Sequence, residues 1–191
     1  MKKIYLLIFI FFGITASVNA DTNRLVSGEI DAKITIIAYE SLTCSHCASF
    51  HKDIYPQLKK DFLDTGLAKI EFRHFPLDIA AFNAAKIAQC NYDQGLEILE
   101  SLYSNQQEWV RGSSIEDVND NLKNFIEKKG FKINFEKCIN NKNIEDFVLN
   151  DRVEGVKNFK VNATPTIIIN NKKFEKSLNY KNLKKILEKL I

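Results

Sequence analysis

The sequence has little glycine, little proline and no marked excess of either charge. Its 191 residues include 7 glycines and 3 prolines, and no segment is repeated or of low complexity. This composition excludes collagen-like chains and disordered chains rich in proline or glycine. The 27 basic and 24 acidic residues nearly balance, which argues against a nucleic-acid-binding protein. With 45% hydrophobic residues, the chain can build a sizeable core.

A long hydrophobic run is also missing after the first twenty residues. Lys2 and Lys3 precede a short apolar run, 4–14, and small side chains follow at 18–20, a pattern typical of a signal peptide. The run is short for a membrane helix, which needs about 20 apolar residues, so an uncleaved anchor is the weaker alternative. We expect cleavage after Ala20 and an exported mature domain, 21–191, with 25 basic residues against 24 acidic ones.

The four cysteines form two pairs of very different spacing. Cys44 and Cys47 enclose Ser45 and His46, where a β-branched segment gives way to a helical pattern. A helix N-terminus carries unpaired N–H groups and a partial positive charge, which favour the thiolate of the first cysteine. His46 adds to this effect when it is protonated or donates a hydrogen bond. The sequence therefore predicts a reactive dithiol at Cys44 and Cys47, with His46 as a third catalytic residue.

Hydrophobic periodicity predicts the order strand, helix, strand, a long helical stretch, strand, strand, helix. The helix after the cysteines should bury one face and kink at Pro56. Asn170 and Asn171 predict a hairpin turn between the last two strands. This order is that of an α/β protein, a thioredoxin fold with an inserted all-α sub-domain at about 78–160. The expected strands are 34–40, 69–75, 166–169 and one that begins at 173; the expected later helices are 79–90, 96–106, 115–129, 144–159 and 180–190.

Three segments of the chain together resemble a known family, the DsbA-like thiol oxidases of the bacterial envelope. They are Cys-Ser-His-Cys at 44–47, Arg-His-Phe-Pro at 73–76 and Val-Asn-Ala-Thr-Pro-Thr at 161–166. The resemblance implies that the Thr164–Pro165 bond is cis and that its loop faces the active-site cysteines. Backbone groups of Thr164 can then pair with an extended substrate, so Thr164 and Pro165 are the predicted substrate-binding residues.

The resemblance also implies a function, a periplasmic oxidase that donates the Cys44–Cys47 disulfide to folding exported proteins. A substrate thiolate attacks Cys44, and a second substrate thiol resolves the mixed disulfide. The family further implies a membrane quinone-linked reoxidase of the DsbB type as a partner. We predict neither a metal nor a cofactor. Ser45 departs from the family, where proline is common at this position, so the turn is expected to be less fixed.

Cys90 and Cys138 both lie within the helical stretch, near apolar side chains. An even number of cysteines in an exported protein predicts a second disulfide with a structural role, and two buried free thiols are the alternative. Closing this loop stabilises a fold by up to about 4 kcal/mol. The resemblance leaves open a role of this pair in tuning the first one.

Two nearby polar residues are open to more than one interpretation. We interpret Glu40 as a surface carboxylate, with a buried proton acceptor as the alternative. We interpret His51 as a residue on the helix surface. A zinc site built from Cys44, His46, Cys47 and His51 is disfavoured, because four ligands within eight residues strain a tetrahedral geometry. His74 is expected to be a satisfied residue near the end of its strand.

Two other functions use the same features. A disulfide isomerase or reductase would need the same two cysteines, but such enzymes are commonly dimers with an N-terminal dimerisation segment. Only about ten residues are expected between Ala20 and the first strand, which favours a monomeric oxidase. A non-catalytic chaperone or binding module is disfavoured, because both cysteines of the dithiol are intact.

Overall fold

Five strands form one mixed sheet in the spatial order β1-β3-β2-β4-β5. The computed structural model describes residues 23–191, so the predicted signal peptide lies outside the described residues. Strands β2 and β3 are parallel, and the other three neighbouring pairs are antiparallel. The strands are β1 (Leu25–Gly28), β2 (Ile34–Glu40), β3 (Ala68–His74), β4 (Thr166–Ile169) and β5 (Lys172–Lys173).

Strand β2 is central, and its side chains are buried on both faces. Ile36 and Ala38 belong to the main core, whereas Ile37 and Tyr39 pack into a smaller cluster on the opposite face. A strand covered on both sides needs a nearly continuous apolar run, which is what 34–40 supplies. This strand leads to the cysteines, so a central strand that is buried on both faces positions them.

One long helical segment begins directly after Cys44 and contains Cys47. It consists of α1 (Ser45–Ser49), the π-helical η1 (Phe50–Ile54), α2 (Tyr55–Leu58) and the π-helical η2 (Lys59–Leu63). Pro56, where a kink was predicted, has no N–H group for an α-helical hydrogen bond, and the π-helical η1 directly precedes α2. The apolar face that the sequence predicts is buried. It consists of Cys47, Phe50, Ile54, Leu58 and Phe62.

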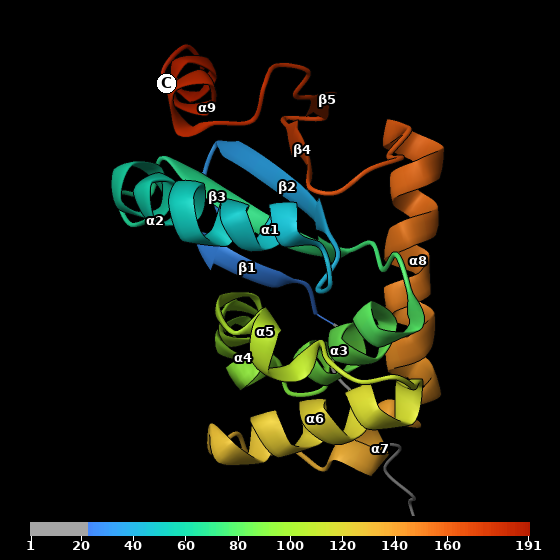
Figure 1. Ribbon diagram of the computed structural model, residues 1–191. Helices are drawn as coiled ribbons and strands as arrows, with labels where there is room; N and C mark the ends of the chain where they lie inside the picture. The colour runs from blue at the N-terminus through green and yellow to red at the C-terminus, as the bar shows by residue number, and fades with distance from the viewer. Residues whose placement is uncertain (1–22) are drawn as a thin grey trace, which may run out of the picture.

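The helical insertion has six helices between β3 and β4. In Figure 1, α3 to α7 gather at one end of the sheet, and α8 runs alongside the sheet and returns the chain toward β4. Side chains of the insertion, such as Leu102 and Ile144, share one hydrophobic core with the sheet. The six are α3 (Ile79–Gln89), α4 (Tyr92–Ser104), α5 (Gln106–Trp109), α6 (Ile115–Lys128), α7 (Phe135–Ile139) and α8 (Lys142–Phe159).

Local signals in the sequence mark several of these ends correctly. The side chain of Ser114 accepts the N–H of Asp117 in a reciprocal capping box at the start of α6. Gly130 follows the end of that helix with φ of 80°, which favours glycine. Asn170 and Asn171 adopt positive φ in the hairpin between β4 and β5, and α9 (Tyr180–Leu187) closes the chain. The predicted fold class, a thioredoxin fold with a helical insertion, is confirmed.

The prediction was wrong about the first strand. The sheet begins at Leu25, in β1, and not at Ile34. Four residues are too few to show a period, and β1 exists because it pairs with the edge of β3. The short helices α5 and α7 were missed for the same reason. Arg24, just before β1, forms ion pairs with Asp151 and Glu154 of α8.

None of the helices between residues 23 and 191 is long and apolar enough to cross a membrane.

Candidate active site

The turn between β2 and α1 presents the two cysteines at the start of a helix. Cys44 is the N-cap residue, in an extended conformation, and its carbonyl oxygen accepts the N–H groups of Cys47 and Ala48 at 3.1 Å each. Cys44 is partly exposed, whereas Cys47 is fully buried. A thiolate from another molecule can therefore reach Cys44, and Cys47 can react only with Cys44 or with groups of the interior.

The loop before β4 lies against Cys44, as the resemblance implies. The Thr164–Pro165 peptide bond is cis, and the thiol of Cys44 donates to the carbonyl oxygen of Thr164 at 3.4 Å. The structure thus brings together Cys44, Cys47, Thr164 and Pro165. His46 is exposed beside them and shares the lining of a groove with Thr164 and Pro165.

This groove has a volume of about 550 Å³ and begins at the cis-proline loop. Leu178 and Tyr180, which are half-buried in the segment that starts α9, contribute apolar surface, and the buried side chains of Phe50 and Ile54 from η1 also border the groove. Asp53 also lines it. A groove of this kind fits an extended polypeptide that carries apolar side chains.

The interior around Cys47 opposes its ionisation. Burial is the largest cause and the negative charge of Glu40 the second, and together they raise the pKa of the Cys47 thiol far above its ordinary value. When the Cys44–Cys47 disulfide opens, the thiolate left on Cys47 therefore takes up a proton. When the disulfide forms again, that proton must leave.

Glu40 and His51 are not surface residues, so both of those interpretations were wrong. Glu40 is 4% exposed and His51 is 7% exposed. Their side chains meet in the core, with His51 Nε2 at 2.9 Å from Glu40 Oε2. The sequence period marks His51 as lying near the buried face of the helix, but its polarity suggested the surface. The His51 ring is buried because Glu40, at the end of β2, provides a polar partner for it in the core.

Hydrogen bonds to three residues outside the turn, Leu77, Asp78 and Gln106, hold it in place. The amide of Gln106, on α5, donates to the carbonyl oxygens of Leu42 at 2.7 Å and of Cys44 at 3.1 Å. The hydroxyl of Thr43 donates to Asp78, the N-cap residue of α3, at 2.7 Å. Ser41 Oγ accepts the N–H of Leu77 at 3.3 Å. Ser45 is exposed and, unlike a proline, does not restrict the backbone of the turn. Contacts from the helical insertion hold the turn instead.

Sequence reasoning missed Gln106 and Asp78 as residues of this site. Gln106 lies 62 positions from Cys44, and nothing in the residues around it marks it as different from Gln107. Asp78 had a readable signal, because an aspartate before an apolar helix is a typical N-cap. That signal predicts the start of α3 and says nothing about Thr43.

Two other histidine predictions can be checked. Between residues 23 and 191, no group of three or more potential metal ligands gathers, and His51 is turned toward Glu40. His74 is buried, and its ring lies 3.2 Å from Gln89, so it is a satisfied residue as expected. Burial lowers the pKa of His74 below its ordinary value.

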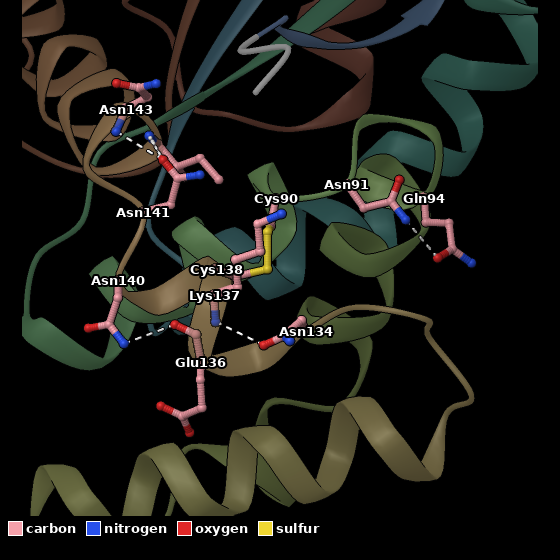
Figure 2. The surroundings of a disulfide bond; sticks show 11 residues. Cys90, Asn91, Gln94, Asn134, Glu136, Lys137, Cys138, Asn140, Asn141 and Asn143 are labelled. Carbon is pink, nitrogen blue, oxygen red and sulfur yellow. Dashed lines mark hydrogen bonds between the residues drawn. A yellow bond between two sulfur atoms is a disulfide. The ribbon is translucent and has the colours of Figure 1, made fainter. Parts of the chain in front are cut away.

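The second cysteine pair is a disulfide within the insertion. Cys90 directly follows α3 and Cys138 lies in α7, with Cα atoms 5.5 Å apart and a sequence separation of 48. Figure 2 shows the bond among polar side chains, including Asn134, which caps α7 by accepting the N–H of Lys137 at 2.9 Å. The bond ties two helices of the insertion to each other.

Comparisons with known proteins agree with this geometry. A family model described as Thioredoxin matches residues 20–189. Disulfide bond formation protein D of Bacillus subtilis is 29% identical over 175 residues, which are 86% of this chain and 75% of that protein. A putative protein-disulfide oxidoreductase of Rickettsia typhi is 25% identical over 78% of this chain, but the match spans only 56% of the rickettsial protein.

Two solved structures are similar over nearly the whole chain. The crystal structure of Wolbachia pipientis α-DsbA1 has a TM-score of 0.78 and 28% identity, covering 88% of this chain and 90% of that one. Oxidised BdbD from Bacillus subtilis has a TM-score of 0.72 and 26% identity, covering 87% and 92%. The fold, the dithiol and these relatives lead to one conclusion: the chain belongs to the thioredoxin family, within which it is a DsbA-like thiol:disulfide oxidoreductase.

Proposed function

We propose that this protein is an oxidase that donates the Cys44–Cys47 disulfide to exported proteins while they fold. The observation that carries the proposal is the asymmetry of the pair. Cys44 is partly exposed at a helix N-terminus beside exposed His46, and Cys47 is fully buried. The partial positive charge of a helix N-terminus in general favours a thiolate at that position. A stabilised thiolate favours the reduced enzyme, which makes its disulfide a stronger oxidant.

The reaction proceeds in two exchanges. A substrate thiolate attacks Cys44 Sγ, a bond forms between the two sulfurs, and the Cys44–Cys47 bond breaks with its electron pair on Cys47. A proton then neutralises Cys47. A second thiolate of the substrate attacks the substrate sulfur of the mixed disulfide and releases Cys44 as a thiolate. The substrate has lost two electrons and the enzyme has gained them.

The substrate would lie along the groove beside the cis-proline loop. Backbone pairing at Thr164 accepts any extended segment, and the partly exposed side chains of Leu178 and Tyr180 favour chains that still expose hydrophobic side chains. Unfolded or folding exported proteins with free thiols have both properties. The proposed site of action is the periplasm, reached through the signal peptide 1–20.

Continued turnover requires a second protein that takes the two electrons from the reduced pair. A membrane-bound, quinone-linked reoxidase of the DsbB type is the proposed partner, and the enzyme is proposed to act as a monomer. Addition of membranes that contain such a reoxidase should convert the single turnover of the purified enzyme into many. Analytical ultracentrifugation tests the monomer.

The decisive measurement is the reduction potential of the Cys44–Cys47 couple in glutathione buffers. A Cys90→Ser/Cys138→Ser variant isolates the couple, because the second disulfide cannot then contribute. A potential near or above about −200 mV is expected for a disulfide donor. A potential near about −270 mV would overturn the oxidase proposal and indicate a reductase or isomerase.

A further inference from the structure

The charged side chains are distributed unevenly along the chain. Residues 170–191 carry seven lysines and two glutamates, whereas residues 23–169 carry 18 basic and 21 acidic side chains. The near balance of the whole chain therefore hides a strongly basic C-terminal segment. In Figure 1, β5 and α9 lie at one end of the molecule, and α3 to α7 gather at the other. One end of the protein is thus basic.

Most of these lysines have no acidic partner. Lys184 forms an ion pair with Asp61 at 3.0 Å. The other six form no ion pair with any residue in 23–191, and five of the six are exposed, all except half-buried Lys173. Lysines on an edge strand protect it from pairing with other chains, but only Lys172 and Lys173 lie in β5. Protection of the sheet edge therefore does not account for the whole charge excess.

The lysines border an apolar cavity between β5 and the end of α9. The cavity has a volume of about 550 Å³, and Lys172 and Lys176 are among its lining residues. Its apolar lining includes half-buried Phe174 and Ile186 and exposed Leu190. One carboxylate, that of Glu175, also lines it. Apolar side chains beside several lysines are typical of protein surfaces that bind at the interface of a membrane.

We propose that this basic end, residues 172–176 and 185–190, docks the protein on a bilayer of anionic phospholipids. The lysines contact the phosphates of the headgroups, and Leu190 and the mouth of the cavity meet the apolar boundary of the bilayer. The proposal concerns where the protein acts, and it is independent of the direction in which Cys44 and Cys47 exchange electrons.

The combination of charge and apolar surface favours a bilayer as the occupant. Free phosphate would be attracted by the lysines alone and would gain nothing from Leu190, which is 43% exposed. An anionic bilayer offers negative charge and an apolar layer together. Lys189 is on the same side of the helix as Ile186, because it follows three positions later and its N–H donates to the carbonyl oxygen of Ile186 at 3.2 Å. Lysine and apolar groups can therefore reach the same surface.

The basic end continues into the substrate groove. Phe174 and Lys176 line the cavity, and Leu178 and Tyr180, which follow a few positions later, line the groove that begins at the cis-proline loop. Docking through 172–176 would therefore hold the groove near the membrane that exported chains cross. This places the dithiol where free thiols of such chains first become accessible.

The test measures binding to lipid vesicles by co-sedimentation at low and high salt. The vesicles contain phosphatidylglycerol and phosphatidylcholine, or phosphatidylcholine alone. The protein is purified after export, and mass spectrometry verifies that the apolar segment 1–20, which would itself bind vesicles, has been removed. Lys172→Glu/Lys176→Glu/Lys189→Glu reverses three charges of the basic end. A second variant has arginine at the same three positions and keeps the charge.

A matched control makes the same change in net charge at the other end of the molecule. Lys129→Glu/Lys132→Glu/Lys137→Glu alters three exposed lysines of the helical insertion, none of which forms an ion pair with a residue in 23–191. Leu190→Ser tests the apolar contribution without a change in charge. Thermal unfolding verifies that each variant is folded.

We expect the wild type to bind the mixed vesicles and not phosphatidylcholine alone. Binding should weaken with salt, because the Debye length falls from about 10 Å at 0.1 M to about 3 Å at 1 M. Reversal of the three lysines should weaken binding by roughly a hundredfold, since each lysine near an anionic surface contributes about fivefold. The arginine variant and the matched control should bind nearly as the wild type does. Leu190→Ser should lose roughly fivefold.

Absence of binding to mixed vesicles at low salt, or an equal loss in the matched control, would overturn the proposal. Capture by immobilised polyglutamate without binding to vesicles would assign the basic end to an acidic protein and would also overturn it. Oxidation of a dithiol peptide in solution should be the same in every variant, because the altered residues lie outside the groove and the reactive turn. Failure of the oxidase proposal and failure of docking therefore appear in different measurements.

Discussion

The two cysteine pairs differ in spacing, surroundings and chemistry. Cys44 and Cys47 lie three positions apart at one turn, where Cys44 is partly exposed and Cys47 is buried. Cys90 and Cys138 lie 48 positions apart and join two helices of the insertion. A disulfide thus serves as the reactive group at Cys44 and Cys47, and as a cross-link between two helices at Cys90 and Cys138. The difference comes from the surroundings: unequal exposure of the two sulfurs promotes exchange, and closure of a long loop promotes stability.

The largest expected effect separates the two sulfurs of the reactive pair. Cys44→Ser should abolish disulfide exchange with a dithiol peptide, because no other described thiol is accessible to attack. Cys47→Ser should instead trap the substrate as a mixed disulfide on Cys44, since the buried resolving thiol is missing. Mass spectrometry under non-reducing conditions, repeated with dithiothreitol, measures the adduct. An adduct that forms equally in Cys44→Ser would refute the assignment of the attacking cysteine.

Removal of the second pair should lower the stability of the protein and leave disulfide exchange intact. Cys90→Ser/Cys138→Ser should lower the free energy of unfolding by up to about 4 kcal/mol, because the unfolded chain regains the freedom of the loop. Exchange by Cys44 and Cys47 should persist under conditions where the variant is folded. Guanidinium unfolding followed by circular dichroism measures the first effect, and peptide oxidation measures the second. Loss of exchange in a folded variant would show that the two pairs are not independent.

A smaller effect is expected where the insertion meets the reactive turn. Gln106→Ala removes the donor to the carbonyl oxygens of Leu42 and Cys44, which should lower the free energy of unfolding by about 1 to 2 kcal/mol. The loosened turn should also slow resolution of the mixed disulfide. Gln107→Ala is the matched control, because its exposed side chain makes no such contact. Equal behaviour of the two variants would remove Gln106 from the site.

The smallest expected effect is a loss of stability at low pH that is caused by His74, at the end of β3. Burial lowers the pKa of His74, so below about pH 6.5 the unfolded chain binds a proton that the folded chain resists. Stability should therefore be complete above that pH and decrease as the pH falls, by at most about 1.4 kcal/mol per pH unit for one proton. Denaturant unfolding of wild type and His74→Gln between pH 7 and pH 5 measures this slope.

His74→Gln should have a shallower slope than the wild type. The Cys90→Ser/Cys138→Ser variant should keep the wild-type slope at a lower overall stability, because a disulfide does not titrate. Parallel curves for wild type and His74→Gln would assign the acid response to other groups.

Much of the fold could be predicted from the sequence because its signals are local. The apolar run of β2 and the spacing from Cys47 to Phe62 determine a buried strand and a helix that packs on it. The capping residue Ser114 and the two asparagines at 170–171 determine a helix start and a hairpin by their own hydrogen bonds and backbone preferences. Segments of four or five residues, such as β1, lie below the length at which a period can be recognised.

The sequence by itself also determined the reactive pair, since the Cys-x-x-Cys spacing and the helix start are contiguous. Only the tertiary structure decided the surroundings of that pair. Gln106 reaches the turn from α5, and His51 faces Glu40 because β2 and the helix above it pack face to face. Contacts between residues far apart in the chain depend on how elements pack, and hydrophobic pattern alone does not specify where a polar side chain in the core finds its partner.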